Sequence, residues 1–202
     1  RAGGAGNVAV NLANLGASVS LVGIAGNDQH GRELKKCVES AGVCWEVLQC
    51  EAETIIKFRV LSRNQQLLRM DFEQHLSEYA DKFFLEHTQQ QIENADLVVF
   101  SDYGKGSLSS INLLLQYCRR VDKTTLIDPK GDCFEKYRGG MLLTPNLAEL
   151  EEVVGLCPNS EVLVAKAENL RASLDLDAIL VTRSEAGMTL IEAAKAPEHF
   201  EA

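Results

Sequence analysis

The sequence predicts an α/β fold in which a mostly parallel sheet carries helices on both faces and a small β lid is attached. Segments with strand alternation take turns with segments of helical periodicity along most of the 202 residues. Short polar clusters follow four of the expected strands, and parallel sheets bind ligands at the carboxyl ends of their strands. A β-rich stretch at about residues 43–73 interrupts the alternation, so we expect it to form a small separate sheet.

The composition is that of an ordinary globular protein, with 46% apolar and 24% charged residues. A net charge of −9 argues against a nucleic-acid partner, because such binding needs a basic surface. No apolar run approaches the roughly 20 residues of a membrane span, so we expect no membrane partner. Six cysteines and four histidines lack the spacing of a zinc site. Free thiols without a disulfide framework favour a reducing, cytoplasmic location.

The first forty residues are predicted to form two helices and a strand. A helix over 7–15 should end at Gly16, because glycine tolerates the left-handed conformation there. A strand over 18–24 follows. Asp28 is well placed to cap a helix over 29–40.

The β-rich stretch contains three expected strands, over 43–49, 54–63 and 66–73. The segment 62–66 has the composition of a hairpin turn, since Asn64 tolerates positive φ.

The rest of the chain alternates between helices and strands, which implies crossover connections and parallel strands. The expected helices cover about 79–94, about 108–121, a segment from 146, and about 160–173. The expected strands cover 97–101, 125–128, 141–144, 178–182 and 188–191.

The chain opens on RAGGAGNVAVNLANLG, in which residues 4–9 fit the pattern of a dinucleotide-binding turn. Such a turn follows a strand, and an acidic residue closes the next strand. Neither condition is met here, because the strand over 18–24 ends without an acid and Asp28 fits a helix cap. A dinucleotide-dependent oxidoreductase is therefore the least favoured interpretation.

Asn146 and Glu149 form an N-x-x-E pattern at the start of an expected helix. The pattern is typical of a capping box, in which each side chain bonds the backbone of the other residue. It is also compatible with a site where Glu149 holds a Mg²⁺-bound water and Asn146 lies near a phosphate. Magnesium ions commonly take one carboxylate together with substrate phosphates.

Three further clusters have both a structural and a functional interpretation. The TRSEAG segment offers Thr182 and Ser184, and it is either a turn with Gly187 at positive φ or a phosphate-binding loop. Lys130 in DPKG lies in a turn or meets a phosphate. SDYGKG is a helix-entry loop or supplies Asp102 as a hydroxyl acceptor with Lys105 as a cation.

The segment 54–73 is locally basic, with four basic and two acidic residues. Lys57, Arg59 and Arg63 share strand parity, so they should point to one face. They form either a charged edge that resists aggregation or a lid over an anionic substrate, since arginine can grip a phosphate bidentately.

These motifs together resemble a known family. GGAGNVAVNLANLG, with Gly26 further on, is similar to the N-terminal signature of the ribokinase-type carbohydrate kinases. GNDQHG and TPNLAE match that family's spacing, and the resemblance covers essentially the whole chain. FRVLSRNQQLLRMDFE (58–73), SDYGKG, LIDPKG and LLTPNLAELE resemble more narrowly the heptose 7-phosphate kinase domains of bacterial ADP-heptose synthesis.

The resemblance implies an ATP- and Mg²⁺-dependent kinase that phosphorylates the anomeric hydroxyl of D-glycero-D-manno-heptose 7-phosphate for lipopolysaccharide core precursors. It also implies a homodimer formed through the lid and, in the full-length protein, a fused nucleotidyltransferase domain. The implied substrate-binding residues are Gly3, Gly4, Asn7, Lys57, Arg59, Asp102 and Lys105. The implied ATP-binding residues are Lys130, Asn146, Leu147, Ala148, Glu149, Thr182, Ser184 and Gly187, with Glu149 also reaching the metal through water.

Two parts of the family pattern are not found among these residues. The strand with a substrate-binding aspartate is missing before Arg1, and the G-A-G-D motif with the catalytic aspartate is missing up to Ala202. We therefore expect residues 1–202 to be a partial kinase domain with little or no activity alone, since no base deprotonates the sugar. The alternatives are a kinase of neutral sugars or nucleosides, and a non-catalytic remnant that only binds ligand.

Overall fold

The structure, a computed structural model, describes residues 1–63 and 65–202. The predicted turn residue Asn64 lies outside the described residues. The chain divides into two compact units, one formed by residues 1–91 with 105–109 and the other by residues 92–104 with 110–202.

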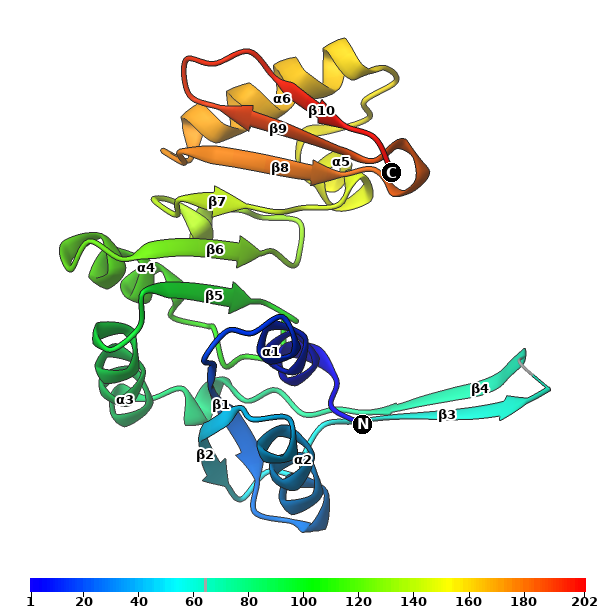
Figure 1. Ribbon diagram of the computed structural model, residues 1–202, viewed down its shortest axis with the longest axis vertical. Coiled ribbons are helices and arrows are strands. Elements are labelled where there is room, and N and C mark those ends of the chain that lie inside the picture. The colour runs from blue at the N-terminus through cyan, green and yellow to red at the C-terminus, as the bar shows by residue number, and fades with distance from the viewer. Residues whose placement is uncertain (64) are drawn as a thin grey trace. The chain divides into compact units, whose positions relative to one another are not determined.

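The first unit is built on two parallel strands, β1 (Ser20–Gly26) and β2 (Cys44–Cys50). The helices α1 (Gly4–Asn14) and α2 (Gln29–Ser40) alternate with them along the chain (Figure 1). α2 covers the predicted residues, with the predicted cap: the Asp28 carboxylate accepts a hydrogen bond from the Gly31 amide at 2.6 Å. Gly16 follows α1 with φ +96°, so the predicted glycine stop is confirmed.

Helices cover both faces of the β1–β2 pair. On one face, Leu21 and Trp45 pack with Ala9 of α1 and Val38 of α2. The next residue, Glu46, points to the opposite face. There, α3 (Lys82–Glu93) follows the short 3₁₀ helix Ser77–Tyr79 and its His87 side chain bonds the Glu46 carbonyl oxygen at 2.9 Å.

The first helix begins three residues earlier than predicted, so Gly4 and Gly6 belong to its first turns rather than to a loop. Gly6 is buried, and a Cβ there would lie 3.4 Å from the Cβ of Ala2 and 3.7 Å from Leu34 of α2. These are ordinary van der Waals distances, so this part of α1 packs against its neighbours without requiring a glycine. The following strand starts at Ser20, two residues later than predicted.

The separate antiparallel sheet is smaller than predicted. Among the described residues it contains two strands, β3 (Ile56–Ser62) and β4 (Gln65–Phe72), which form the long ribbon of Figure 1. The predicted first strand of the lid is instead β2, which pairs in parallel with β1. The sequence pattern could not separate the two, because strand alternation does not reveal the pairing partner.

The second unit contains a six-stranded sheet in the order β10-β9-β8-β7-β6-β5. Strands β5 to β8 are parallel, while β9 and β10 are antiparallel to their neighbours, so the predicted mostly parallel sheet is confirmed. The strands are β5 (Leu97–Ser101), β6 (Thr124–Asp128), β7 (Leu142–Leu143), β8 (Ala178–Thr182), β9 (Met188–Glu192) and β10 (Glu198–Phe200).

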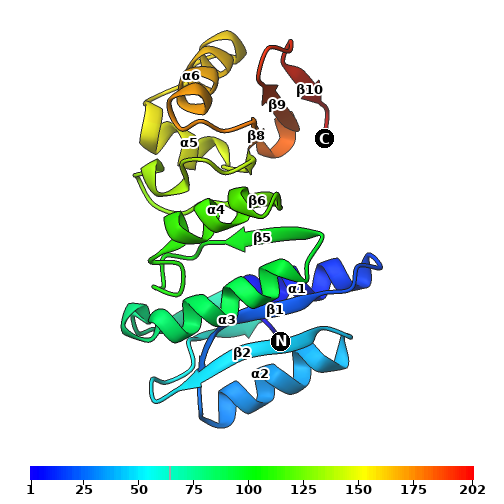
Figure 2. The same cartoon turned by 90° about the vertical axis from the view of Figure 1, so that its left-hand side faces the viewer.

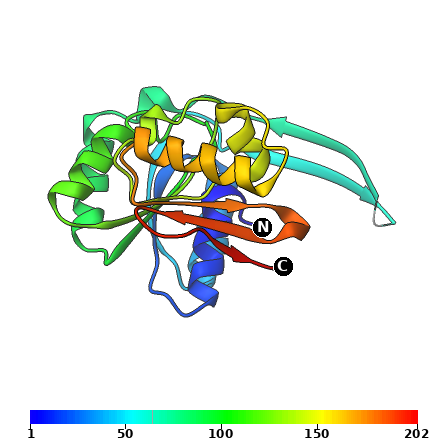
Figure 3. The same cartoon turned by 90° about the horizontal axis from the view of Figure 1, so that it is seen from above.

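The helices α4 (Ile111–Arg120), α5 (Leu147–Val154) and α6 (Ser160–Ser173) lie on one face of this sheet (Figures 2 and 3). The parallel strands follow one another in a single direction across the sheet, and right-handed crossovers then place every connecting helix on the same side. Alternate residues such as Ile127 and Ile179 are fully buried, while their neighbours Leu126 and Leu180 are half-buried.

The edge strand β10 was not predicted, since all three of its residues are exposed and show no apolar alternation. Its position explains Gly187, which has φ +76° as predicted. A Cβ at Gly187 would lie 1.8 Å from the carbonyl oxygen of Phe200, so only glycine allows the chain to pass there.

Candidate functional site

A buried carboxylate follows β5, where a parallel sheet places its ligands. Asp102 is 7% exposed. Its Oδ1 accepts a hydrogen bond from the Gly104 amide at 2.7 Å, and its Oδ2 accepts bonds from Lys136 Nζ at 2.8 Å and the Tyr137 hydroxyl at 2.7 Å. Burial alone would raise the pKa of Asp102, but the hydrogen bonds from Lys136, Gly104 and Tyr137 lower it overall, so the carboxylate is ionised.

The Tyr137 hydroxyl also contacts the predicted phosphate-binding loop after β6. The Lys130 amide donates to this oxygen at 2.8 Å. Burial, together with the hydrogen bond to Asp102, raises the pKa of Tyr137 strongly, so it stays a neutral donor. Tyr137 lies in the 3₁₀ helix Glu135–Tyr137, an element that the sequence pattern did not predict.

The predicted capping box is confirmed at the start of α5. Asn146 Oδ1 accepts from the Glu149 amide at 2.9 Å, and Glu149 Oε2 accepts from the Asn146 amide at 3.2 Å. Lys130 Nζ bonds the other oxygen, Oε1, at 3.1 Å. This bond raises the pKa of Lys130, so the ammonium group keeps its proton.

A second carboxyl group lies at the end of β6. Burial raises the pKa of Asp128, and the nearby negative charge of Glu149 raises it further. Its Oδ2 accepts a hydrogen bond from the Ser101 hydroxyl at 3.5 Å. Asp128 therefore takes up a proton more readily than an ordinary aspartate, whereas Asp102 does so less readily.

The predicted nucleotide loop follows β8. Thr182 donates its amide to the Pro145 carbonyl at 3.0 Å and forms an isolated parallel bridge with Asn146. Ser184 has φ +52° and begins the 3₁₀ helix Ser184–Ala186. These contacts connect one group of predicted residues: Lys130, Asn146, Glu149 and Thr182. Leu147 and Ala148 lie in the first turn of α5, and Ser184 and Gly187 lie in the adjoining loop.

Three predicted sugar-binding residues lie at the start of α1 in the first unit. Gly3 precedes the helix in an extended conformation, and the space around its missing side chain is open for at least 4 Å. Gly4 has φ +53°. Asn7 is exposed in the first turn, so its side chain is accessible to a ligand. This geometry is compatible with a substrate approaching the backbone at Gly3.

The predicted cations of the lid differ in their partners. Lys57 pairs with Asp71 at 3.9 Å and Glu73 at 3.6 Å, and Lys105 also bonds Glu73. No carboxylate of residues 1–63 and 65–202 forms an ion pair with Arg59, which instead faces Arg69 across the ribbon. Arg63 follows the end of β3 and has φ +46°. The prediction that it shares strand parity with Lys57 and Arg59 is therefore wrong.

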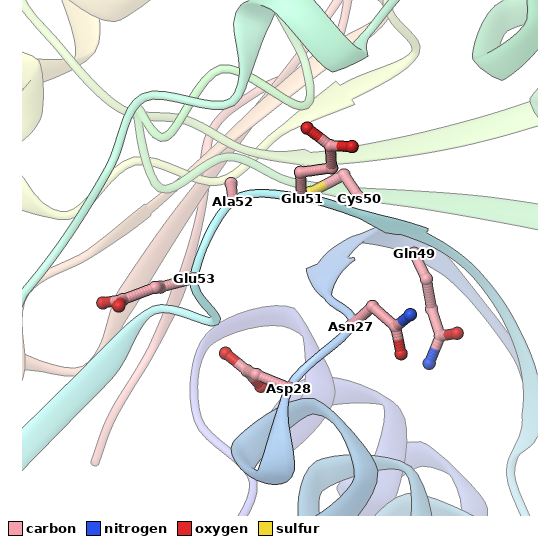
Figure 4. Close-up of a pocket in the computed structure, with 7 residues that line it drawn as sticks. All are labelled: Asn27, Asp28, Gln49, Cys50, Glu51, Ala52 and Glu53. Carbon is pink, nitrogen blue, oxygen red and sulfur yellow. The ribbon is translucent and has the colours of Figure 1, made fainter.

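A hollow of about 460 Å³ lies beyond the ends of β1 and β2 (Figure 4). Asp28 lines it together with Glu51 and Glu53. Both oxygens of Asp28 are used: Gly31 and the hydroxyl of Thr54 bond Oδ1, and the Thr54 amide bonds Oδ2. Burial opposes these bonds, yet together they lower the pKa of Asp28 to about 2. The carboxylate is therefore a structural cap. A dinucleotide-binding oxidoreductase would instead need an acidic residue here to bind the cofactor's ribose.

Sequence reasoning missed three groups that shape the candidate site: Lys136, Tyr137 and Glu73. Lys136 and Tyr137 lie more than thirty residues after Asp102, in a segment without regular periodicity. The signal that the sequence offered was an aromatic residue within a polar loop. Among the described residues, no group of three or more His, Cys, Asp or Glu side chains could hold a metal ion, and no helix has the length and apolarity needed to cross a membrane.

Comparisons with known proteins agree with this architecture. The sequence profile of the pfkB family carbohydrate kinases matches residues 1–201. The bifunctional protein HldE of Chromohalobacter salexigens is 48% identical over 201 residues, which cover 99% of this chain and 42% of that protein. HldE of Proteus mirabilis is 46% identical with the same coverage. The chain spans about two fifths of the length of these relatives.

Solved structures share the fold. Phosphofructokinase-2 from Escherichia coli, in complex with fructose-6-phosphate, superposes with a TM-score of 0.79 at 18% identity, covering 98% of this chain and 67% of that one. A PfkB protein from Polaromonas sp. JS666 gives 0.79 at 15% identity, covering 100% and 72%. Identities this low show the fold alone, but the profile match and the HldE relatives go further: the chain belongs to the pfkB family of carbohydrate kinases.

Proposed function

We propose that this chain is part of an ATP-dependent kinase that phosphorylates the anomeric hydroxyl of D-glycero-D-manno-heptose 7-phosphate to the 1,7-bisphosphate. The observation that carries the proposal is the 48% identity to the bifunctional protein HldE over 99% of this chain. The motifs SDYGKG, LIDPKG and LLTPNLAELE, which resemble heptose 7-phosphate kinases, support it. The product would serve ADP-heptose and lipopolysaccharide core synthesis in the cytoplasm.

The second unit would bind ATP. Several backbone amides and one cation lie near the capping box. They belong to Lys130, Asn146, Thr182 and the loop with Ser184 and Gly187. Leu147 and Ala148 would contribute amides of the first turn of α5, which favours anions. This grouping of the predicted residues in one compact unit supports the assignment.

Glu149 fits the role of a Mg²⁺ ligand through water. Each of its oxygens accepts one hydrogen bond, so each keeps a lone pair for a metal-bound water. A single carboxylate suits Mg²⁺, which takes further ligands from phosphates and water. When bound, Mg²⁺ would neutralise charge on the phosphates, while Lys130 and the helix start would orient them.

The sugar-phosphate-binding residues that we propose in the first unit are Gly3, Gly4, Asn7, Lys57, Arg59 and Lys105. In the second unit we propose Asp102. Arg59 is the strongest candidate for the 7-phosphate, because Lys57 and Lys105 already share Glu73. Asp102 would accept a sugar hydroxyl. The base that deprotonates the anomeric hydroxyl would come from the G-A-G-D motif, which is not among these residues.

The full protein would form a homodimer through the β3–β4 ribbon and carry a fused nucleotidyltransferase domain. The ribbon supports the first part, because one of its faces is apolar and exposed, with Phe58 50% and Phe72 54% accessible. The relatives named bifunctional, which are more than twice as long as this chain, support the second.

Arg59→Glu in the complete natural protein tests the phosphosugar assignment. We expect the Kd for heptose 7-phosphate, measured by calorimetry, to rise at least about tenfold, since charged hydrogen bonds contribute roughly 1.5–3 kcal/mol. Arg32→Glu, at an exposed arginine of α2, is the matched control and should leave the Kd unchanged. An unchanged Kd in Arg59→Glu would favour a kinase of neutral sugars or nucleosides.

A further inference from the structure

Tyr137 connects the two halves of the proposed site within the second unit. The residue is 0% exposed, and its ring packs edge-on against Phe134 with 5.7 Å between the ring centroids. The hydroxyl donates its single proton to Asp102, which is charged and closer at 2.7 Å than the Lys130 carbonyl at 3.2 Å. The same oxygen accepts the Lys130 amide at 2.8 Å. The ring packing therefore fixes the hydroxyl between a carboxylate and a loop backbone.

The contacts continue from Lys130 to the nucleotide side. Its ammonium group bonds Glu149 at 3.1 Å, and Glu149 in turn closes the capping box with Asn146. A continuous path of hydrogen bonds and ion pairs thus leads from Asp102 through Tyr137 and Lys130 to the start of α5. No step of this path crosses between the two units.

Asp102 keeps room for a ligand despite its three partners. An ionised carboxylate has about four acceptor positions. Gly104 uses one on Oδ1, while Lys136 and Tyr137 use two on Oδ2. One position on Oδ1 is left for a sugar hydroxyl, and the two bonds on Oδ2 hold the group's orientation.

We propose, on the basis of the function above, that Tyr137 is a positioning residue that couples the sugar and nucleotide sides of the site. Its hydroxyl sets the distance between the Asp102 carboxylate and the Lys130 backbone. A sugar hydroxyl that orders Asp102 therefore also orders the Lys130–Glu149 pair, and each ligand binds more tightly when the other is present.

The test is Tyr137→Phe in the complete natural protein, which removes one oxygen and keeps the ring. The Kd of a non-hydrolysable ATP analogue is measured with and without heptose 7-phosphate. We expect the Kd of the analogue without sugar to rise at least threefold. We also expect the ratio of the Kd without sugar to the Kd with sugar to fall to about one, so that the sugar no longer improves the affinity. Tyr117→Phe, which removes another hydroxyl-to-carboxylate bond of this unit, to Glu93, is the matched control and should preserve both values.

A merely structural role would lower the melting temperature of Tyr137→Phe but leave the affinity gain at its wild-type ratio, and that result overturns the proposal. A wild-type protein without any such gain overturns it as well. If Tyr137→Phe does not fold, Asp102→Asn replaces it: the Kd of the analogue without sugar must then rise at least threefold, and no rise overturns the proposal. The measurements without sugar stand even if the protein phosphorylates another sugar, whereas a wild type that binds no ATP analogue refutes the proposed function itself.

Discussion

Glu149 holds two roles in one side chain, because it closes the capping box at Asn146 and pairs with Lys130. Glu149→Gln separates them. Glutamine retains the capping contact but has no charge to hold a metal-bound water. We expect the Mg²⁺ concentration for half-maximal activity of the complete protein to rise at least about fivefold.

Glu151→Gln is the matched control for that measurement. Glu151 lies in the same helix, and its carboxylate accepts a hydrogen bond from the Cys157 amide at 2.7 Å. Its Mg²⁺ dependence should equal the wild type's. A Glu149→Gln protein with unaltered Mg²⁺ dependence would show that Glu149 serves the helix cap alone.

Asp28 predicts a pH-dependent contribution to stability. Its pKa is lowered to about 2 in the folded protein, against 3.8 for an ordinary aspartate. A lowered pKa stabilises the fold above pH 3.8, and this stabilisation is lost as the pH falls from there toward 2. Asp28→Ala should therefore cost about 1 kcal/mol at pH 7, in the range of an N-cap, and much less near pH 2.5.

The control for Asp28→Ala is Asn159→Ala, which removes the cap of α6, where Asn159 accepts from the Val162 amide at 2.9 Å. Asparagine does not titrate, so Asn159→Ala should lower the free energy of unfolding by the same amount at both pH values. Urea denaturation measures both variants. An Asp28→Ala cost that stays constant with pH would contradict the lowered pKa.

At the residue scale, local chemistry was predictable and distant contacts were not. The caps at Asp28 and Asn146 follow from side chains that bond the backbone three residues later, so short patterns reveal them. The bonds of Asp102 to Lys136 and Tyr137 span more than thirty residues and depend on the pairing of β5 with β6. No local pattern encodes such a distance.

The β3–β4 ribbon has two chemically different faces. Phe58 lies opposite Met70 and Val60 opposite Leu68 on one face, while Lys57 and Arg59 lie on the other. All of these side chains are exposed, and a two-stranded ribbon alone is marginally stable in water. An apolar face of this kind is typical of an interface between proteins.

Phe58→Asp should weaken the proposed homodimer, since it places a charge within the apolar face. Light scattering coupled to size exclusion should show a monomer at concentrations where the wild type is a dimer. Leu15→Asp, at a leucine that is 85% exposed and outside the ribbon, is the control and should stay dimeric. A Phe58→Asp protein that remains dimeric would exclude this face as the interface.

At the element scale, helices and strands with regular periodicity were predicted to within about three residues, including α2, β5, α6 and β8. The prediction was wrong where tertiary contacts decide. Gly4 and Gly6 are helical, with Gly6 buried next to Leu34 of α2. Strand β2 joins β1 because both are covered by the same helices. Exposed β10 carries no pattern to detect.

For the whole molecule, the missing G-A-G-D motif predicts a specific defect. Residues 1–202 on their own should give ATP turnover with heptose 7-phosphate at least about a thousandfold below the complete protein, because the base and the anion-stabilising groups are absent. A coupled ATPase assay measures both proteins. Comparable turnover would mean that a residue of this chain acts as the base.

The proposed function requires the complete protein to transfer a phosphoryl group to the anomeric hydroxyl of heptose 7-phosphate. The direct measurement is ³¹P NMR of the product formed with Mg·ATP. We predict consumption of ATP with the appearance of a phosphate coupled to the anomeric proton, in addition to the original 7-phosphate signal. Phosphorylation of fructose or a nucleoside, with heptose 7-phosphate left unchanged, would contradict the account.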